Sequence, residues 1–302
     1  MSKNREQGLP MFALIGQLTV DGVTMGMVYV ILSAGIVFIM SVSRIFYLAY
    51  GQFYMLGAFI AWMAVETYHL PFLVGLSLAV LMTATLGVLT YRFIFQYTTY
   101  SDQKFLATIV AAVGLMLVLS QSGLVIFGTG THSIPSLFRG MVSGFDINVT
   151  VDKLVLLIVT IVVTLLLFLF YDKTGIGRAM RAVSFLPDVA SLQGIDDKRI
   201  CLISVGIGTA LAGFAGAMIA PSYGIYPEMG HNVIVSVLLI ATLGGIDSLM
   251  GAVVGGIVVG LVLSFGQYFI GSYSQVILFL VAGIIIFFKP GGLLGHGTEL
   301  ET

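Results

Sequence analysis

Long apolar runs separated by short polar stretches dominate the pattern of positions along this chain. A helix needs about 20 apolar residues to cross a bilayer, and the chain reaches that length repeatedly. The runs are continuous rather than alternating, which favours helices over the strands of a membrane barrel. We predict an all-α, polytopic transmembrane bundle of about eight or nine membrane segments, some of them broken or re-entrant. The expected segments are roughly 12–42, 47–66, 71–92, 105–127, 153–171, 200–220, 232–247, 250–269 and 273–288.

Composition agrees with a bilayer as the main solvent. Hydrophobic residues make up 58% of the chain and charged residues 9%, whereas soluble domains carry about 25% charged residues. The net charge of −1 and the scattered basic residues argue against a nucleic-acid partner. Cys201 is the only cysteine, so we expect no intrachain disulfide and no metal site, and interpret it as a small buried hydrophobe.

The N-terminus and the basic residues suggest an orientation. Lys3 and Arg5 precede an apolar stretch that continues to about Met40 without a cleavage pattern, so we expect a retained helix rather than a signal peptide. With the loop 172–199 placed in the cytoplasm, nine Lys and Arg residues fall inside and four outside. We therefore predict a periplasmic N-terminus and a cytoplasmic C-terminus for a multi-pass protein of the bacterial inner membrane.

The stretch from Asp172 to Arg199 interrupts the apolar pattern, with 9 of the chain's 27 Asp, Glu, Lys and Arg residues in 28 positions. A short helix here would present Arg178 and Arg181 on one side, and a second, capped by Asp188, would end near Gly194. Apolar residues are interleaved with the charges, which a merely solvated loop would not need: Met180, Val183, Leu186, Val189 and Leu192. We predict a cytoplasmic elbow that docks into a groove on another protein.

The sequence of this elbow resembles that of a known family. GRAMRA followed by ASLQGID is similar to the cytoplasmic coupling loop of the ABC permeases for branched-chain amino acids, where GRA-x-RA and A-x-x-x-GI segments have this spacing. Four further runs agree in order: DGVTMGMVYVILSAGIVFIM, YGQFYMLGAF, LGGIDSLMGAVVGG and KPGGLLG. In that family the loop contacts the ATP-hydrolysing subunit. The resemblance assigns this contact to Gly177, Arg178, Arg181, Ala182, Asp188 and Gly194.

The resemblance also implies partners. Members of the family work as heterodimers of two related permeases, with two ATP-binding subunits and a periplasmic solute-binding protein. The chain contains no G-x-x-x-x-G-K-[ST] phosphate loop and no Gly-Lys pair, so energy would arrive through a partner. We therefore expect residues 1–302 to form a single permease domain, with 172–199 as its coupling loop. It would be a transport subunit rather than an enzyme, and it would need no cofactor.

The start of the second predicted helix departs from the family pattern. Many members carry Asn-Phe-Ala-His-Gly-Glu there, where this chain has Tyr-Leu-Ala-Tyr-Gly-Gln from Tyr47 to Gln52. On one helix, Tyr47, Tyr50 and Tyr54 would share a face and could contact an aromatic or planar solute. These tyrosines and Gln52 are candidate pathway residues, and an interfacial aromatic belt is the alternative. The departure leaves the solute open, with leucine, isoleucine and valine only one possibility.

Small residues suggest how the helices pack. Gly208 and Gly216 belong to one series with a spacing of four, and Gly251 and Gly255 to another, which lets helix backbones approach closely in lipid. Asp21, the sole acidic residue deep in the first apolar run, is expected to cap the main part of that helix, with a contact to the solute as the alternative. Glu66, His69, His231 and Asp247 are expected at helix ends. The connections 128–152 and 221–231 should face the periplasm together, where they could meet a partner or shape an entrance, or could be merely solvated loops.

Two other classes of protein remain as alternatives. An ion- or proton-coupled secondary transporter would place ionisable groups near the middle of the membrane, and the deep segments are nearly free of them. A membrane enzyme would need clustered His, Asp, Glu or Cys residues, and no such cluster is visible in the sequence.

Overall fold

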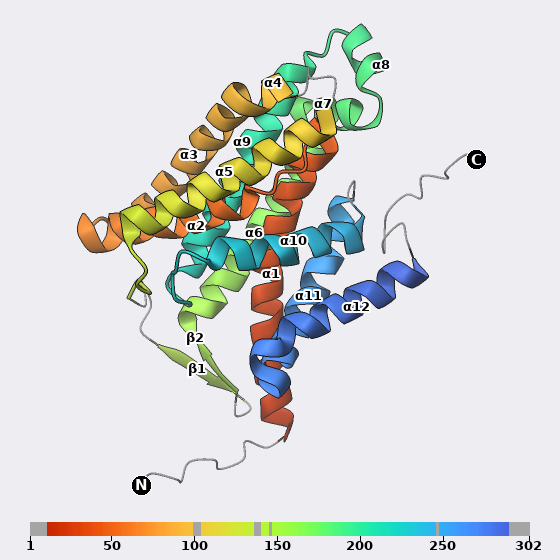
Figure 1. Cartoon of the computed structure of the whole chain (residues 1–302). Helices are drawn as coiled ribbons and strands as arrows, with labels where there is room; N and C mark the ends of the chain where they lie inside the picture. Colours follow the sequence, from red (N-terminus) through yellow and green to blue (C-terminus); the bar gives the residue numbers. More distant parts are fainter. Residues whose placement is uncertain (1–10, 99–103, 136–139, 145–146, 246–247, 290–302) are drawn as a thin grey trace.

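The computed structural model describes residues 11–98, 104–135, 140–144, 147–245 and 248–289. Every predicted membrane segment corresponds to a helix (Figure 1). The elements are α1 (Met11–Ser43), α2 (Tyr50–Trp62), α3 (Phe72–Thr90), α4 (Gln96–Thr98), α5 (Lys104–Phe127), β1 (Met141–Gly144), β2 (Ile147–Thr150), α6 (Val151–Lys173), α7 (Gly175–Phe185), α8 (Pro187–Leu192), α9 (Asp197–Ile219), α10 (Met229–Gly244), α11 (Leu249–Ile270) and α12 (Ser274–Phe288). A π-helical turn, Met63–Thr67, extends α2, and another, Tyr91–Phe95, joins α3 to α4.

Six helices of the described chain are long and apolar enough to span a membrane. They are α1, α3 with its extension to Thr98, α5, α6, α9 and α11. The helices α2, α10 and α12 have 13, 16 and 15 residues, so each is shorter than the roughly 30 Å of a hydrocarbon core. The structure thus supports a polytopic helical bundle in which some segments are shorter than a full crossing.

Helix α1 is the central element, and two other helices pack against successive parts of it. Its first part lies antiparallel to α11, where the Ser264 hydroxyl donates to the Leu18 carbonyl oxygen at 2.7 Å. At the other end of the α1–α11 interface, the Ser33 hydroxyl donates to the Ala252 carbonyl oxygen at 3.3 Å. Its second part lies against α9, where the Cys201 thiol faces the Val42 carbonyl oxygen at 3.7 Å. Cys201 is buried, as expected of a small hydrophobe.

Glycines allow the close helix contacts. A Cβ atom at Gly208 would meet the Gly35 carbonyl oxygen of α1 at 2.7 Å, and one at Gly216 would collide with the Tyr54 carbonyl oxygen of α2. Gly251 lies directly against Gly244 where α10 turns into α11, and a Cβ at Gly255 would contact the Ile240 side chain at 3.1 Å. Close backbone approach of this kind maximises packing where lipid offers no hydrophobic driving force.

The two ends of the bundle differ (Figure 1). One end carries α7 and α8 beside the Ser43 end of α1, and we refer to it as the elbow end. The opposite end carries the Met11 end of α1 and an antiparallel β-hairpin, in which Met141 pairs with Thr150; we refer to it as the hairpin end. The sequence did not predict this hairpin. Two connections meet at this end through paired backbone hydrogen bonds of 2.9 and 2.8 Å between His132 and Ile225.

The expected role of Asp21 is wrong. Helix α1 continues without a break from Met11 to Ser43, so Asp21 lies inside it and caps nothing. Its carboxylate instead pairs with the Lys153 ammonium of α6 at 2.6 Å. The Lys153 ammonium therefore stabilises the Asp21 carboxylate, in place of the backbone N–H groups that a helix start would have offered it. Glu66, His69 and His231 lie near helix ends as expected, and Asp247 lies outside the described residues.

Candidate functional site

The elbow begins with a tight turn between α6 and α7. The Thr174 hydroxyl caps α7 by accepting the Gly177 N–H at 3.0 Å. A Cβ at Gly177 would collide with the carbonyl oxygen of Tyr171, so only glycine fits there. Gly194 follows α8 with a φ of +82°, a left-handed conformation that glycine adopts without strain.

The start of α8 differs from the expectation. Helix α8 begins at Pro187, with Leu186 in the capping position, so Asp188 is not the cap. Its carboxylate lies in the first turn of the helix, exposed to solvent. Proline fits the first helical position because its fixed φ suits a helix and its missing N–H has no partner to lose. At the end of α7, the Ala182 carbonyl oxygen accepts the Leu186 N–H at 3.1 Å.

The two elbow arginines have different surroundings. Arg181 turns back to the end of α6, where its guanidinium donates to the Tyr171 carbonyl oxygen and lies 4.9 Å from the Tyr171 ring centre. The same group lies 3.4 Å from the Asp172 carboxylate. Arg178 is exposed and makes no such contact within the described structure. Arg181 thus holds α7 against α6, whereas Arg178 faces outward.

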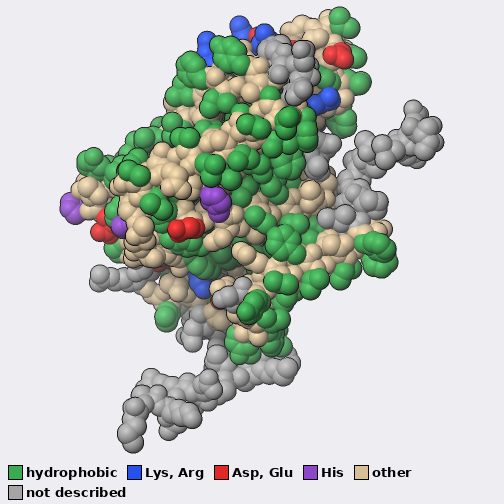
Figure 2. Space-filling model, viewed as in Figure 1, with side chains coloured by type: hydrophobic (Ala, Val, Ile, Leu, Met, Phe, Trp, Pro, Cys, Tyr) green, Lys and Arg blue, Asp and Glu red, His purple; other side chains and the backbone are tan. Residues whose placement is uncertain are grey.

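Apolar side chains project from the elbow into open surroundings. Leu192 is 86% exposed and Phe185 is 70% exposed, and Leu186 and Val189 are exposed beside them. Met180 and Val183, on the other face of α7, are buried against the bundle. Figure 2 shows Lys, Arg, Asp and Glu side chains around hydrophobic ones at this end. This arrangement of apolar side chains with surrounding charges is typical of a docking surface.

Most of the expected pathway residues lie inside the helix packing. Tyr47, Tyr50 and Gln52 are fully buried. Tyr47 lies in the turn before α2, so it does not share a helix face with Tyr50 and Tyr54, and its hydroxyl hydrogen-bonds Thr90 at 2.7 Å. Helix α1 ends at Ser43, and the next residue, Arg44, has a left-handed conformation with a φ of 54° where the chain leaves the helix.

Tyr50 and Gln52 also contact other helices. The Tyr50 hydroxyl fits into the space left by Gly35 on α1, and no hydrogen-bond partner for it is present among the described residues. The Gln52 amide nitrogen hydrogen-bonds His231 at 3.0 Å. Tyr54 is the exception, because its side chain reaches a cavity.

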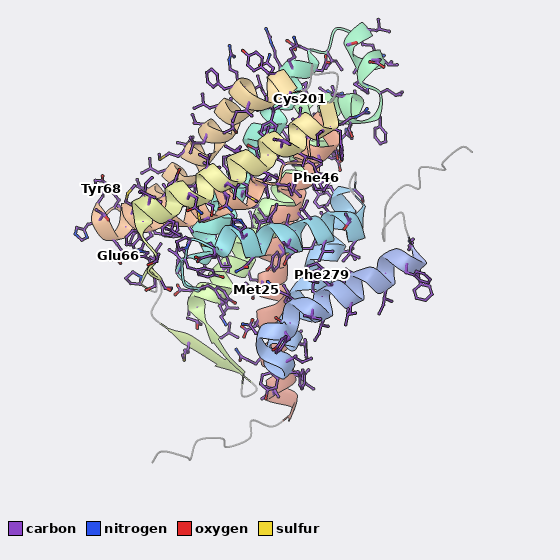
Figure 3. All side chains as sticks on the ribbon, viewed as in Figure 1. Met25, Phe46, Glu66, Tyr68, Cys201 and Phe279 are labelled. Carbon is purple, nitrogen blue, oxygen red and sulfur yellow. The ribbon has the colours of Figure 1, made fainter. Side chains whose placement is uncertain are left out.

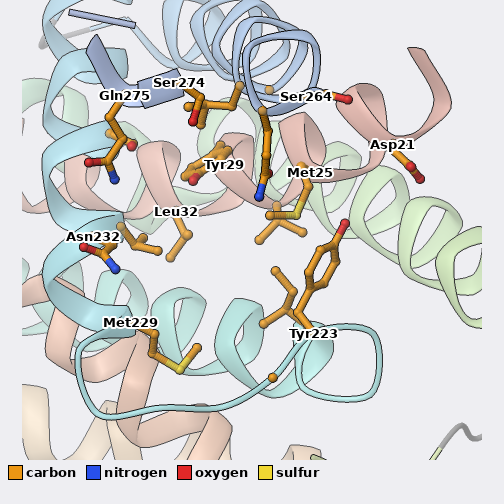
Figure 4. A pocket seen from close by; sticks show the side chains of 18 of the residues that line it. Asp21, Met25, Tyr29, Leu32, Tyr223, Met229, Asn232, Ser264, Ser274 and Gln275 are labelled. Atoms are coloured by element: carbon orange, nitrogen blue, oxygen red, sulfur yellow. The ribbon is translucent and has the colours of Figure 1, made fainter. Parts of the chain in front are cut away.

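This cavity has a volume of about 660 Å³ and lies toward the hairpin end. It is formed where α1, α2, α6, α10, α11 and α12 meet the connection that follows α9 (Figure 4). Five tyrosines line it, together with the carboxamides of Asn232, Gln267 and Gln275; the tyrosines are Tyr29, Tyr54, Tyr223, Tyr226 and Tyr268. Apolar side chains form much of the rest of the wall, among them Leu18, Met25, Val28, Leu32, Ile219 and Val233.

Asp21 and Lys153 are the only charged residues among the described residues that line the cavity. Their side chains are 27% and 22% exposed, so the pair is accessible from the cavity. Tyr223 lies nearby in the connection between α9 and α10. Burial, with a further contribution from the Asp21 carboxylate, raises the pKa of Tyr223 to about 12. Its hydroxyl therefore stays protonated at physiological pH and can donate a hydrogen bond.

Sequence reasoning missed this cavity as a site. One signal was present in the sequence, because Asp21 and Lys153 have opposite charges and each directly precedes a long uncharged apolar run. No local pattern joins them, since they are 132 positions apart. No group of three or more His, Cys, Asp or Glu residues suited to a metal ion occurs in the described part of the chain.

Comparisons with known proteins bear on the whole chain. A family model described as "Branched-chain amino acid transport system / permease component" matches residues 18–288. The chain belongs to this family. The match extends from α1 to the end of α12, so the elbow and the cavity both belong to the part that defines a family permease. Family members are transport subunits of ABC transporters.

Individual relatives are similar over nearly all of this permease. LivH of Salmonella typhimurium, a high-affinity branched-chain amino acid transport system permease protein, is 27% identical over 291 residues, which cover 91% of this chain and 94% of LivH. BraD of Pseudomonas aeruginosa, with the same description, is 26% identical over 93% of this chain and 95% of BraD. LivM of Escherichia coli K12 is 25% identical over 93% of this chain and 71% of LivM.

Proposed function

We propose that this permease is the membrane-spanning subunit of an ATP-driven importer in the bacterial inner membrane, and that it translocates branched-chain amino acids or a related small polar or aromatic solute. The observation that carries the proposal is the elbow of residues 172–199. It exposes Phe185, Leu186, Val189 and Leu192 on a chain that has no phosphate loop of its own. A permease of this family therefore needs an ATP-hydrolysing partner, and the elbow offers a surface for one.

The elbow would couple ATP hydrolysis to movement of the helices. Arg178 and Asp188 are exposed on it and would meet the partner directly, beside the apolar side chains. Gly177 and Arg181 would act by fixing the elbow to α6, Ala182 by accepting the Leu186 N–H at the end of α7, and Gly194 by shaping the return to α9. Arg44, at the end of α1, contacts the Ser184 carbonyl oxygen at 3.4 Å. A displacement of the elbow would thus reach both α6 and the central helix as a rigid-body shift.

A second permease would complete the transmembrane part. In Salmonella typhimurium, LivH and LivM are both described as permease proteins of a high-affinity branched-chain amino acid transport system, and both are similar to this chain. We infer a heterodimer with a related permease, two ATP-binding subunits on the cytoplasmic side and a solute-binding protein on the periplasmic side. The N-terminus and the hairpin end would then be periplasmic, consistent with the distribution of Lys and Arg.

The test uses the transporter encoded with its neighbouring genes, purified as a complex and reconstituted into liposomes. We expect the ATP-binding subunits to copurify with this chain, and uptake of labelled leucine, asparagine or phenylalanine to require ATP hydrolysis. A protonophore should leave uptake unchanged. Uptake that persists with a non-hydrolysable ATP analogue but collapses with the proton gradient would instead identify an ion- or proton-coupled carrier.

A further inference from the structure

A second hollow, away from the cavity, lies between α3 and α9 and has a volume of about 430 Å³. The two helices touch along a line where a Cβ atom at Gly87 would collide with the Thr209 side chain, and the hollow opens beside this line. We refer to it as the α3–α9 groove. All of its lining residues are apolar, and all but one are half-buried: Ala84, Val88, Leu202, Ile203, Gly206, Ile207 and Ala210. Both helices are long enough to span a membrane, so the groove faces an apolar neighbour.

The shape of the groove suits a single extended hydrocarbon chain. Leu202, Gly206 and Ala210 are four residues apart, so they lie on one face of α9, and the two small residues leave a hollow between larger neighbours. With a rise of about 1.5 Å per residue, this row extends about 12 Å along the helix. One leaflet supplies about half of the roughly 30 Å hydrocarbon core. The groove is therefore about as long as one leaflet is deep.

Positive charges stand at one end of the groove. Ala84, Val88 and Arg92 are four residues apart on α3 and the turn that follows it, and Lys198 precedes Leu202 by four on α9. Arg92 and Lys198 are exposed. The Tyr91 side chain hydrogen-bonds Cys201, so Arg92 lies level with the first turns of α9. Arg92 itself makes no hydrogen bond or ion pair within the described part of the chain.

The charged end is the elbow end of the molecule. Figure 3 shows Cys201 toward the elbow end and Glu66, just before α3, at the opposite side. No Lys or Arg occurs in residues 66–91 or 200–228, so the other end of the groove has no cation from these segments. Figure 2 shows Lys and Arg side chains gathered at the elbow end, above a largely hydrophobic surface.

The acidic residues near the start of α9 do not cancel this positive charge. Asp196 is paired with Arg199 at 3.0 Å. Arg92 and Lys198 then leave an excess of one positive charge over Asp197. An arginine at the end of a membrane helix reaches the level of the lipid headgroups, and its guanidinium matches two phosphate oxygens at once.

We propose that the α3–α9 groove binds one anionic phospholipid, with an acyl chain along Ala84, Gly206 and Ala210 and its phosphate at Arg92 and Lys198. A linear apolar hollow that ends in cations matches a linear hydrocarbon chain that ends in an anion. The chain would also fill a hollow whose lining otherwise loses packing contacts. This site goes beyond the proposed function, because it requires neither ATP nor the transported solute.

The first test measures headgroup preference. The complete transporter in detergent is titrated with dioleoyl phosphatidylglycerol or dioleoyl phosphatidylcholine, and native mass spectrometry measures the fraction with bound lipid. We expect phosphatidylglycerol to bind at least about fivefold more tightly, the factor that one cation near a membrane surface contributes. Arg92→Gln should remove most of this preference. Lys173→Gln, which removes an exposed cation at the elbow end of α6, should retain it. Equal affinity for the two lipids, or an unchanged preference in Arg92→Gln, would overturn the proposal.

The second test locates the acyl chain. A phosphatidylglycerol with a diazirine in its acyl chain should crosslink to peptides of α3 and α9 in the complete transporter. Ala84→Leu with Ala210→Leu fills the groove and should lower this crosslinking severalfold, whereas Gly283→Leu, where a Cβ atom meets nothing within 4 Å, should not. Crosslinks spread equally over α5 and α12 would show ordinary boundary lipid and overturn the site. Groove crosslinks in the isolated full-length chain but not in the transporter would show that a partner subunit covers it, which also overturns it. Uptake that proves independent of ATP would refute the importer proposal without altering this one.

Discussion

The elbow and the cavity distribute polar and apolar groups in opposite ways. The elbow displays Leu192 and Phe185 outward and keeps its charges around them, whereas the cavity is lined by an ion pair and carboxamides among apolar side chains. Exposed apolar side chains on a short helical projection suit a macromolecular partner that can cover them. Polar groups that line a concave cavity suit a small solute whose hydrogen bonds and charges they can match. The difference teaches that one chain offers a surface for a macromolecule at the elbow and a site for a small solute in the cavity. Helices α1 and α6 connect the two.

The largest expected effect on this comparison comes from forcing apart two packed helices of the bundle, α9 and α2, since both interfaces depend on the folded bundle. In Gly216→Leu the new side chain would collide with the Tyr54 backbone of α2, and overpacking of this kind typically costs about 1–3 kcal/mol or more. We expect loss of folded protein from the membrane, measured as the monodisperse fraction after detergent extraction. Gly283→Leu is the matched control, because a Cβ there meets nothing within 4 Å. Equal yields for both variants would contradict the role of Gly216 in helix contact.

The next change removes the apolar character of the elbow. Burying a leucine is worth about 1.5–3 kcal/mol, so Leu192→Asp should weaken association with the ATP-binding subunits by about tenfold or more. Copurification from membranes at graded detergent or salt concentrations measures this. Gln193→Asp adds the same charge at the adjacent exposed position and should have little effect. If the two variants lose the partner equally, charge rather than apolar contact controls docking.

A smaller effect should separate the two elbow arginines. Arg181→Glu removes the contacts with Tyr171 and places a second carboxylate near Asp172, so it should loosen α7. Charged hydrogen bonds of this kind contribute about 1.5–3 kcal/mol, and limited trypsin digestion should cut the elbow faster. Arg178→Glu should leave digestion near the parent rate, apart from the lost cleavage site, while weakening ATPase association. The opposite pattern would mean that Arg181 is the residue that meets the partner.

The elbow was predictable because its signals are local. Its charges, glycines and apolar residues lie within 28 positions, and its helices follow from them. The helices of the bundle were predictable for the same reason, since each is one continuous apolar run. The difference between Arg178 and Arg181 was not, because it depends on the Tyr171 ring and carbonyl group at the end of another helix.

The cavity was not predictable because its residues come from separate segments. Tyr54, Lys153, Tyr223 and Gln275 belong to four different parts of the chain, and only the tertiary structure brings them together. The aromatic positions around Tyr47 and Tyr50 attracted attention as a run, yet two of the three tyrosines pack between helices. The positions that depart from the family pattern therefore lie in the helix packing, and of the three tyrosines only Tyr54 contacts the cavity.

The smallest expected effect concerns these two packed tyrosines, which lie outside both interfaces. Tyr47→Phe removes the 2.7 Å hydrogen bond to Thr90 and should lower stability by about 0.5–1.5 kcal/mol. Tyr50→Phe removes a buried hydroxyl that lacks a partner among the described residues, so it should be neutral or slightly stabilising. Thermal unfolding of the detergent-solubilised complex measures both, and uptake should be unchanged in both. A loss of uptake in Tyr50→Phe at unchanged stability would restore this hydroxyl to the solute pathway and extend the functional region beyond the cavity.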